Sequence, residues 1–91
     1  MKQLKKSGQF KKDLRRYLHK PSKLLALKTV TTSLEQYGFV PSEYSPHKLH
    51  GIYEGCMECH VEDDFLLIWI DETTNIIRLL RLGTYHELFG I

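Results

Sequence analysis

The sequence predicts an α+β fold with the element order β-α-α-β-β-β, in which two N-terminal helices pack on a mostly antiparallel four-stranded sheet. Apolar residues recur at helical spacing in the first 38 residues, whereas short, strongly apolar runs follow from residue 56 onward. The first pattern is typical of amphipathic helices and the second of strands. Because the strands follow the helices instead of alternating with them, we expect the helices on one face of the sheet. The length of 91 residues suits a single domain, 1–91, with a small core.

The N-terminal part of the chain predicts one strand and one helix. Residues 2–6 are a short alternating piece that suits a first strand. Ser7 suits the N-cap of the helix that follows, because its side chain can accept a hydrogen bond from a free amide of the first turn. The apolar stripe of this helix has the spacing i, i+4, i+7 and i+8: Phe10, Leu14, Tyr17 and Leu18. Pro21 ends the helix, because proline cannot continue the hydrogen-bond ladder.

A second helix and a long loop come next. Pro21 and Ser22 favour a new helix start, and Gly38 suits its C-cap. The apolar stripe of this helix consists of Leu24, Leu27, Val30 and Leu34. Residues 41–55 contain two prolines and two glycines, and we expect them to form a loop.

Three strands are predicted in the second half, at 56–61, 65–71 and 75–82, with a hairpin turn over 71–75. The middle strand begins with six consecutive apolar residues, which indicates burial on both faces of the sheet. Gly83 ends the last strand, and residues 85–89 form a short tail.

The charge of the chain is distributed unevenly. Residues 1–28 contain ten Lys or Arg residues and one acid, Asp13, whereas residues 29–91 contain three basic and ten acidic residues. A basic segment of this kind attracts phosphate backbones, so we expect contacts with nucleic acid, although a solvated helix face gives the same pattern. The basic residues of the first helix are Lys11, Lys12, Arg15 and Arg16. No apolar run approaches the ~20 residues of a membrane span and no signal segment is visible, so we expect a cytoplasmic protein.

His60 and Asp64 are the first candidates for chemistry. They flank the approach to the buried middle strand, which would hold them accurately in place. Histidine is the usual general acid or base near neutral pH, and a nearby carboxylate can orient it. The same spacing also fits a surface histidine beside solvated acids. His47 and His50 lie in the loop that leads into the sheet.

The cysteines suggest two interpretations, a haem attachment site and a zinc site. Cys56-x-x-Cys59-His60 matches the motif of covalent haem attachment, and together with His47 and His50 it resembles a zinc quartet. Both readings require the two thiols to converge. A strand would instead place Cys56 and His60 on one face and Cys59 on the other, so we expect two small, partly buried, reduced thiols.

Two further residue types suit nucleic-acid chemistry. Arg78 and Arg81 are three apart on a strand and point to opposite faces, and Arg81, next to the tail, is the better candidate for clamping a phosphate. Phe65 and Tyr85 are the aromatic residues nearest to the polar cluster, where such rings can stack on an unpaired base.

Five segments of the chain follow one another in the order seen in YafQ-like toxins of the RelE/ParE superfamily, from bacterial type II toxin–antitoxin systems. They are SGQFKKD at 7–13, HKLHG at 47–51, ECHVEDDFLLI at 58–68, RLLRLGT at 78–84 and LFG at 88–90. The sequence resembles this family over nearly its whole length. The resemblance implies a ribosome-dependent mRNA endonuclease that enters the A site of the 70S ribosome and cuts the bound codon.

The implied chemistry uses the ribose 2′-OH as nucleophile, an acid that protonates the leaving 5′-oxygen, and neither metal nor other cofactor. The resemblance gives roles to the histidines His47 and His60, to the carboxylate of Asp64 and to the basic Arg81. Phe89 matches the tail phenylalanine of the family, and Lys48 lies beside His47 in the matching loop. The resemblance also implies a cognate antitoxin of the DinJ type, with a ribbon-helix-helix domain, that masks the site.

The chain departs from the family pattern at the tail and after the aspartate. The family histidine two residues after the tail glycine is Tyr85 here, and His86 follows it. Either Tyr85 takes the acid/base role, or His86 reaches the site after a local shift. The family tryptophan after the aspartate is Phe65, which retains stacking. Two alternatives stay open: a catalytically weak or inactive binding module with this fold, and a gyrase-directed toxin of the ParE type.

Overall fold

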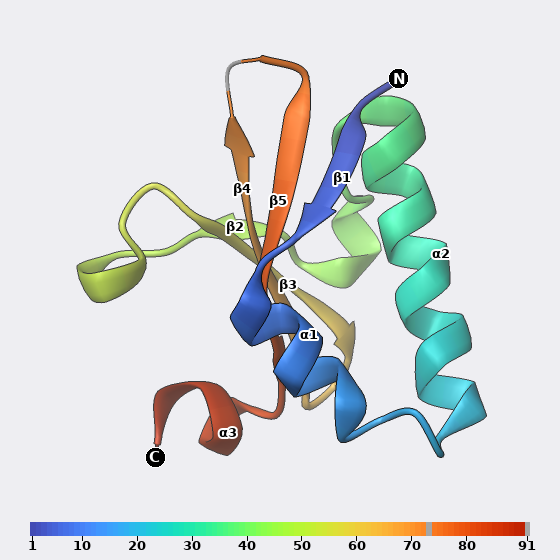
Figure 1. The fold of residues 1–91 in the computed structure, drawn as a ribbon. Coiled ribbons are helices and arrows are strands. Elements are labelled where there is room, and N and C mark those ends of the chain that lie inside the picture. Colours follow the sequence, from blue (N-terminus) through green and yellow to red (C-terminus); the bar gives the residue numbers. More distant parts are fainter. Residues whose placement is uncertain (73, 91) are drawn as a thin grey trace.

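The computed structural model describes residues 1–72 and 74–90 and arranges them as helices on a mixed, mostly antiparallel sheet (Figure 1). Within these residues the sheet has five strands in the order β1-β5-β4-β3-β2. The strands are β1 (Gln3–Lys6), β2 (His47–Lys48), β3 (Met57–Glu62), β4 (Phe65–Glu72) and β5 (Ile76–Gly83). Strand β1 runs parallel to β5, and the other neighbours are antiparallel. The predicted α+β class is confirmed.

The predicted number of strands, four, is too low by one. The additional strand β2 lies within the segment 41–55 that was expected to be only loop, between the short 3₁₀ turns η1 (Ser42–Tyr44) and η2 (Gly51–Tyr53). Strand β2 contains two residues, which pair with Glu58 and Met57 of β3. Two residues are too few to show any periodicity in a sequence, because a strand is recognised by alternation over four or more positions. This short pairing brings His47 next to Glu58.

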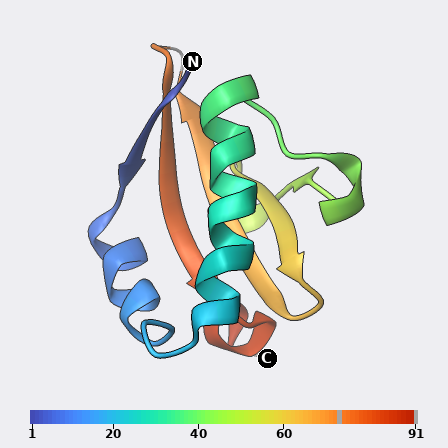
Figure 2. The same cartoon turned by 90° about the vertical axis from the view of Figure 1, so that its right-hand side faces the viewer.

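Helices α1 (Gly8–Arg15) and α2 (Pro21–Tyr37) cover one face of the sheet, as predicted (Figure 2). The side chain of Ser7 accepts a hydrogen bond from the amide of Phe10, which confirms the N-cap. Gly38 ends α2 in the left-handed conformation, with its amide bonded to the carbonyl of Leu34. The main core lies between these helices and the sheet and includes Phe10, Tyr17, Leu27, Val30, Leu34, Cys59, Phe65, Leu67, Trp69, Ile77, Leu79 and Leu82.

A third helix, α3 (Tyr85–Phe89), packs on the opposite face of the sheet, where only a short tail was expected. It begins with a capping box in which Thr84 and Glu87 each bind the backbone of the other. Its buried residue Leu88 joins Leu66, Ile68 and Cys56 in a second, smaller apolar cluster. Strand β4 is therefore covered on both faces, as its continuous apolar run indicated.

Beyond the end of β1, the edge of β5 is covered by α1 and by Ser7, the N-cap of α1. Strand β1 pairs with β5 only up to Leu79. Beyond that point the hydroxyl of Ser7 donates to the carbonyl of Leu80 (3.0 Å), and the amide of Leu82 donates to Oδ2 of Asp13 (3.0 Å). Because an unpaired edge amide inside the fold would be costly, Asp13 takes the place of a missing strand partner.

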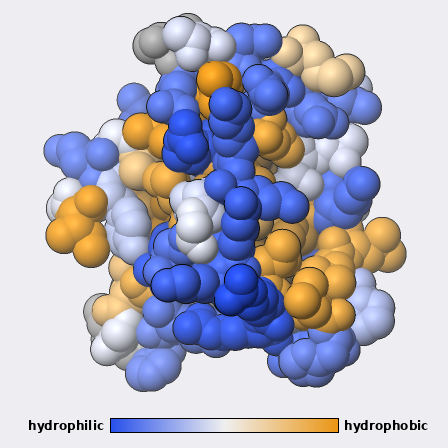
Figure 3. All heavy atoms as spheres, in the orientation of Figure 1, coloured by the Kyte–Doolittle hydropathy of each residue, from blue (hydrophilic) through white to orange (hydrophobic). Residues whose placement is uncertain are grey.

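Figure 3 shows the face that carries α1, where hydrophilic residues form a continuous band between apolar areas on either side. The basic residues Lys11, Lys12, Arg15 and Arg16 of this region are all exposed. Among the described residues, no helix combines the length and apolar character that crossing a bilayer would require.

Candidate active site

His47, Glu58 and His60 lie side by side on β2 and β3. Glu58 is opposite His47 on one side and Ile68 on the other, and His60 is opposite Leu66. Directly paired residues point to the same face of a sheet. Because Leu66 and Ile68 belong to the cluster under α3, these three polar side chains lie on the α3 face, away from α1 and α2.

The two histidines are oriented by backbone carbonyls. Nδ1 of His47 donates to the carbonyl of Ser45 (2.9 Å), and Nδ1 of His60 donates to the carbonyl of Asp63 (3.1 Å). A carbonyl can only accept, so each Nδ1 carries a proton and the neutral ring keeps its lone pair on Nε2. The ring centroids lie 6.4 Å apart. His60 therefore offers Nε2 as a base.

His47 and Glu58 hold one proton between them. Nε2 of His47 lies 3.2 Å from Oε1 of Glu58, and the Glu58 side chain is only 6% exposed. A lone pair facing a carboxylate would repel it, so either the imidazole or the carboxyl must be protonated. Burial raises the pKa of Glu58, while the charges of His47 and His60 oppose this rise. Oε2 of Glu58 has no hydrogen-bond partner within the described part of the chain. The pair can therefore give or take a proton.

Glu58 was not among the residues predicted from the sequence. The available signal was strand alternation, which placed it on the same face as His60, two positions earlier. Its partner could not be identified in this way, because His47 comes from a two-residue strand.

Replacing Glu58 by glutamine is expected to raise the free energy of unfolding at pH 7. Because the pKa of Glu58 is raised in the folded state, its ionised form opposes folding, and this cost disappears as the pH falls below about 4.5, the ordinary value. The gain of Glu58→Gln should therefore shrink between pH 7 and pH 4, as urea unfolding at both pH values would measure. Glu54→Gln, at a side chain 74% exposed, is the matched control. A less stable Glu58→Gln at pH 7 would show that the bond to His47 outweighs burial.

Asp64 and Tyr85 meet at the start of α3. Oδ1 of Asp64, at the turn before β4, accepts a hydrogen bond from the amide of Tyr85 (2.8 Å). The Tyr85 ring is 49% exposed and packs against Phe89, with centroids 4.9 Å apart. Phe89 in turn lies perpendicular to the ring of Tyr53, with centroids 5.9 Å apart. The structure thus brings the predicted residues Asp64, Tyr85 and Phe89 together, and His86 lies next to Tyr85 on the exposed side of α3.

The guanidinium of Arg81 is hydrogen-bonded to Asp13 and to Tyr53. Its Nε and Nη2 atoms donate to the two carboxylate oxygens of Asp13 (2.8 and 3.4 Å), and Nη1 donates to the hydroxyl of Tyr53 (3.0 Å). Its side chain is 19% exposed, whereas Asp13 is fully buried. A phosphate clamp at Arg81 must therefore share the guanidinium with Asp13.

Phe65 was predicted to stack on a base, and the structure corrects this. The ring is completely buried and packs against Tyr17, with centroids 4.7 Å apart. Strand alternation directs Phe65 toward α1 and α2, into the main core. A buried ring has no face to offer to RNA, so the base-stacking role is wrong for this residue.

One row of paired residues across the sheet connects His60 to the start of α3. His60 is opposite Leu66, which is opposite Gly83, just before α3. Since neighbouring strands lie about 4.8 Å apart, His60 and the start of α3 are separated by roughly 10 Å. Lys48 is exposed and follows His47 on β2, but its pairing with Met57 directs it to the opposite face of the sheet. Lys11, Lys12 and Arg15 lie on α1, which packs on that same face, whereas Nη1 of Arg16, just after α1, lies 3.8 Å from Oε2 of Glu87 in α3.

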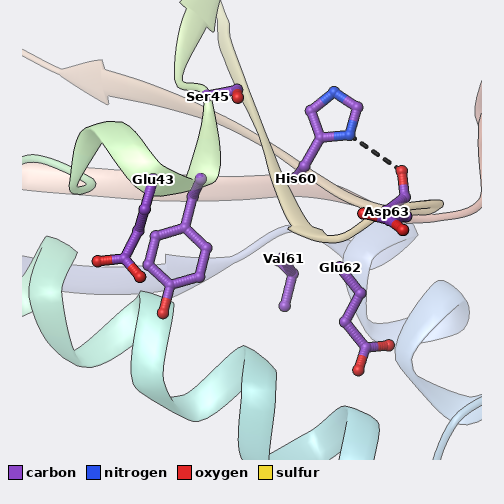
Figure 4. A pocket seen from close by; sticks show the side chains of 7 residues that line it. Glu43, Ser45, His60, Val61, Glu62 and Asp63 are labelled. Carbon is purple, nitrogen blue, oxygen red and sulfur yellow. Dashed lines mark hydrogen bonds between the residues drawn. The ribbon is translucent and has the colours of Figure 1, made fainter.

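A surface pocket of about 330 Å³ adjoins His60. It lies between η1 and the β3–β4 turn and is lined by Glu43, Tyr44, Ser45, His60, Val61, Glu62 and Asp63. Figure 4 shows the carboxylates of Glu43 and Glu62 pointing away from the imidazole of His60. Glu62 is also neutralised by Lys23, whose Nζ lies 2.6 Å from Oε1.

The two cysteines do not converge, as the alternation predicted. Cys56 belongs to the small cluster under α3 and Cys59 to the main core, and both are free thiols. Among residues 1–72 and 74–90, no three His, Cys, Asp or Glu side chains gather in a way that could hold a metal ion. The zinc quartet suggested by the spacing is therefore not formed.

The sequence and the fold agree with one family of known proteins. Residues 2–90 match the family described as bacterial toxin of type II toxin–antitoxin system, YafQ. The chain belongs to the YafQ family. It is 34% identical over 85 residues to the mRNA interferase toxin YafQ of Escherichia coli K12, covering 92% of this chain and 91% of that protein.

Solved YafQ structures have the same fold. The chain aligns with a point mutant of YafQ from E. coli with a TM-score of 0.86 and 32% identity, over 99% of this chain and 100% of the other. It aligns equally fully with YafQ in the crystal structure of the E. coli DinJ–YafQ complex, with a TM-score of 0.84 and 32% identity. The predicted family is confirmed, and its placement in the RelE/ParE superfamily is consistent with these findings.

Proposed function

We propose that this YafQ-family toxin is an mRNA interferase that cleaves messenger RNA in the A site of the 70S ribosome. The relative from E. coli is named an mRNA interferase. The observation that carries the proposal is the group of His47, Glu58 and His60, in which one ring offers the lone pair of its Nε2 and the adjacent pair holds a transferable proton. Proton transfer at neutral pH is what cleavage by a ribose 2′-OH requires.

In this mechanism His60 and the His47–Glu58 pair act on one side of the scissile phosphate and Tyr85 on the other. His60 takes the proton of the 2′-OH through Nε2, the oxygen attacks the adjacent phosphorus, and the bond to the 5′-oxygen breaks. Tyr85 donates a proton to that leaving oxygen, while Asp64 fixes the start of α3. The separation of roughly 10 Å between β3 and the start of α3 leaves room for the phosphate between base and acid. His86 is the second candidate for the acid.

Positive charge and aromatic surface near the site support RNA binding. Arg81, which pairs with Ile68 on the face of His60, is the candidate for offsetting the charge that builds up on the phosphoryl oxygens. Lys48 is directed to the opposite face and is assigned to a more distant phosphate. Phe89 and Tyr85 present the aromatic surface that Phe65 cannot. The exposed basic residues of α1 are assigned to more distant phosphates of ribosomal RNA.

A DinJ-like antitoxin with a ribbon-helix-helix domain is the proposed protein partner, and the cytoplasm, where ribosomes and mRNA meet, is the proposed location. The relative in E. coli forms a complex with DinJ. The antitoxin would cover the α3 face and so block access to His60.

Primer extension on a translated mRNA tests the proposed function. The purified chain, added with 70S ribosomes, is expected to produce cuts within codons, and the same message without ribosomes is expected to remain intact. Adding a DinJ-like antitoxin that binds this chain should abolish the cuts. An uncut message in the presence of folded protein and ribosomes would contradict the proposal and leave a binding module. DNA damage without translation arrest would indicate the gyrase-directed alternative instead.

A further inference from the structure

Helix α3 carries Tyr85 and Phe89, yet it is too short to hold its own position. It has five residues, and isolated helices of this length do not form in water. Its place on the sheet must therefore be fixed by contacts with other elements. One of these is the burial of Leu88, and the others meet at Glu87.

Glu87 joins the start of α3 to the end of α1. Oε1 of Glu87 accepts hydrogen bonds from the amide of Thr84 (2.9 Å) and from the hydroxyl of Tyr17. Nη1 of Arg16 lies 3.8 Å from Oε2. Burial first, and then the bond to Glu87, raise the pKa of Tyr17, so the hydroxyl remains a donor. Burial opposes ionisation of Glu87, but the bonds from Tyr17 and Thr84 still lower its pKa, so it remains an acceptor.

The same residues are also connected to Asp64, through Phe65 and through Tyr85. The ring of Tyr17, only 4% exposed, packs against Phe65, the residue after Asp64. Asp64 accepts the hydrogen bond from the amide of Tyr85. Tyr17 therefore contacts both sides of the junction between Asp64 and α3, through its ring on one side and its hydroxyl on the other.

The glycine before α3, Gly83, leaves room for the side chain of Glu87. Gly83 has a φ of +156°, and a Cβ at this position would lie 2.6 Å from Oε1 of Glu87. A side chain at position 83 would thus collide with the oxygen that binds Tyr17 and Thr84. Glycine lets the Glu87 carboxylate approach closely enough to accept both hydrogen bonds.

We propose that Tyr17 and Glu87 are positioning residues, which set Tyr85 against Asp64 without touching the substrate. The inference rests on the proposed function for its effect on catalysis, since Tyr85 is the acid in that mechanism. A misplacement of the order of 1 Å at a reacting group can cost about 10²-fold in rate.

Tyr17→Phe is the sharpest test, because it removes the hydroxyl and keeps the ring that packs on Phe65. It is expected to lower kcat for mRNA cleavage on programmed ribosomes about tenfold, with KM unchanged. In a Tyr85→Phe background the same change should cost nothing further, because the group that it positions is gone. Glu87→Gln, whose amide oxygen can still accept both bonds, should retain most of the activity that Glu87→Ala loses. Tyr37→Phe, at a ring 68% exposed, is the matched control.

Hydrogen exchange of the Tyr85 amide separates this inference from the proposed function. Tyr17→Phe should accelerate that exchange, relative to wild type and to Tyr37→Phe, whether or not the chain cleaves RNA. If the wild-type chain does not cleave mRNA but Tyr17→Phe still accelerates the exchange, the proposed function is overturned and the positioning role is supported. Unchanged exchange in Tyr17→Phe would overturn the positioning role. An equal loss of kcat with and without the Tyr85 hydroxyl would also overturn it.

Discussion

Replacing His60 by glutamine is expected to lower mRNA cleavage by about 10²–10⁴-fold, the range that a general acid or base contributes. The carbonyl of Asp63 fixes the proton of His60 on Nδ1, so that Nε2 is the atom that can take a proton. Glutamine keeps a similar volume and a hydrogen-bond donor, but it cannot take up a proton near neutral pH. Single-turnover cleavage of mRNA on programmed ribosomes, followed by primer extension, would measure the loss.

His50→Gln is the control for this change. His50 lies in the same region of the chain, but its side chain is 88% exposed and its Nδ1 lies 3.5 Å from Oε2 of Glu54, which is also exposed. We expect cleavage by His50→Gln to match that of the wild type within about twofold, since exposed ion pairs contribute little. If His60→Gln cleaved as fast as His50→Gln, His60 would not be the base. Circular dichroism of both variants would show that the fold is retained.

Replacing Asp13 by alanine is expected to lower the free energy of unfolding by about 3–5 kcal/mol, the usual cost of removing one partner from a buried ion pair. Asp13 is completely buried and accepts bonds from Arg81, from the amide of Leu82 and from Gln9. Its loss would leave a partly buried guanidinium and an edge amide of β5 without their acceptor. For a chain of this size, the midpoint of thermal unfolding should fall by at least about 10 °C.

Asp71→Ala is the matched control for Asp13→Ala. The carboxylate of Asp71 is 43% exposed and lies 3.2 Å from Nζ of Lys2, so its loss should cost no more than about 1 kcal/mol. Burial opposes the ionisation of Asp13, but Arg81 and the amide of Leu82 keep its pKa below the ordinary 3.8. The stabilisation is therefore complete above about pH 4 and is lost as the pH falls through the lowered pKa. Equal stabilities of the two variants at pH 7 would contradict the role given to Asp13.

The elements with long, regular patterns could be predicted from the sequence. The stripe from Leu24 to Leu34 specified α2, and the apolar run from Phe65 to Ile70 specified a strand buried on both faces. The short elements β2 and α3 could not, because two and five residues show no readable period. These two elements carry His47 and Tyr85, so the least predictable parts of the fold complete the proposed site.

The sequence by itself determined the α+β class, the basic N-terminal segment, the candidates His60 and Asp64, and the resemblance to the YafQ family. These follow from local spacing, composition and motif order, which need no knowledge of distant contacts. Only the tertiary structure decided the partners: His47 with Glu58, Arg81 with Asp13, and Tyr17 with Glu87. It also moved Phe65 from a base-stacking role into the core. The physical reason is that each pair joins residues from different strands or helices, and whether a side chain is buried depends on what packs against it.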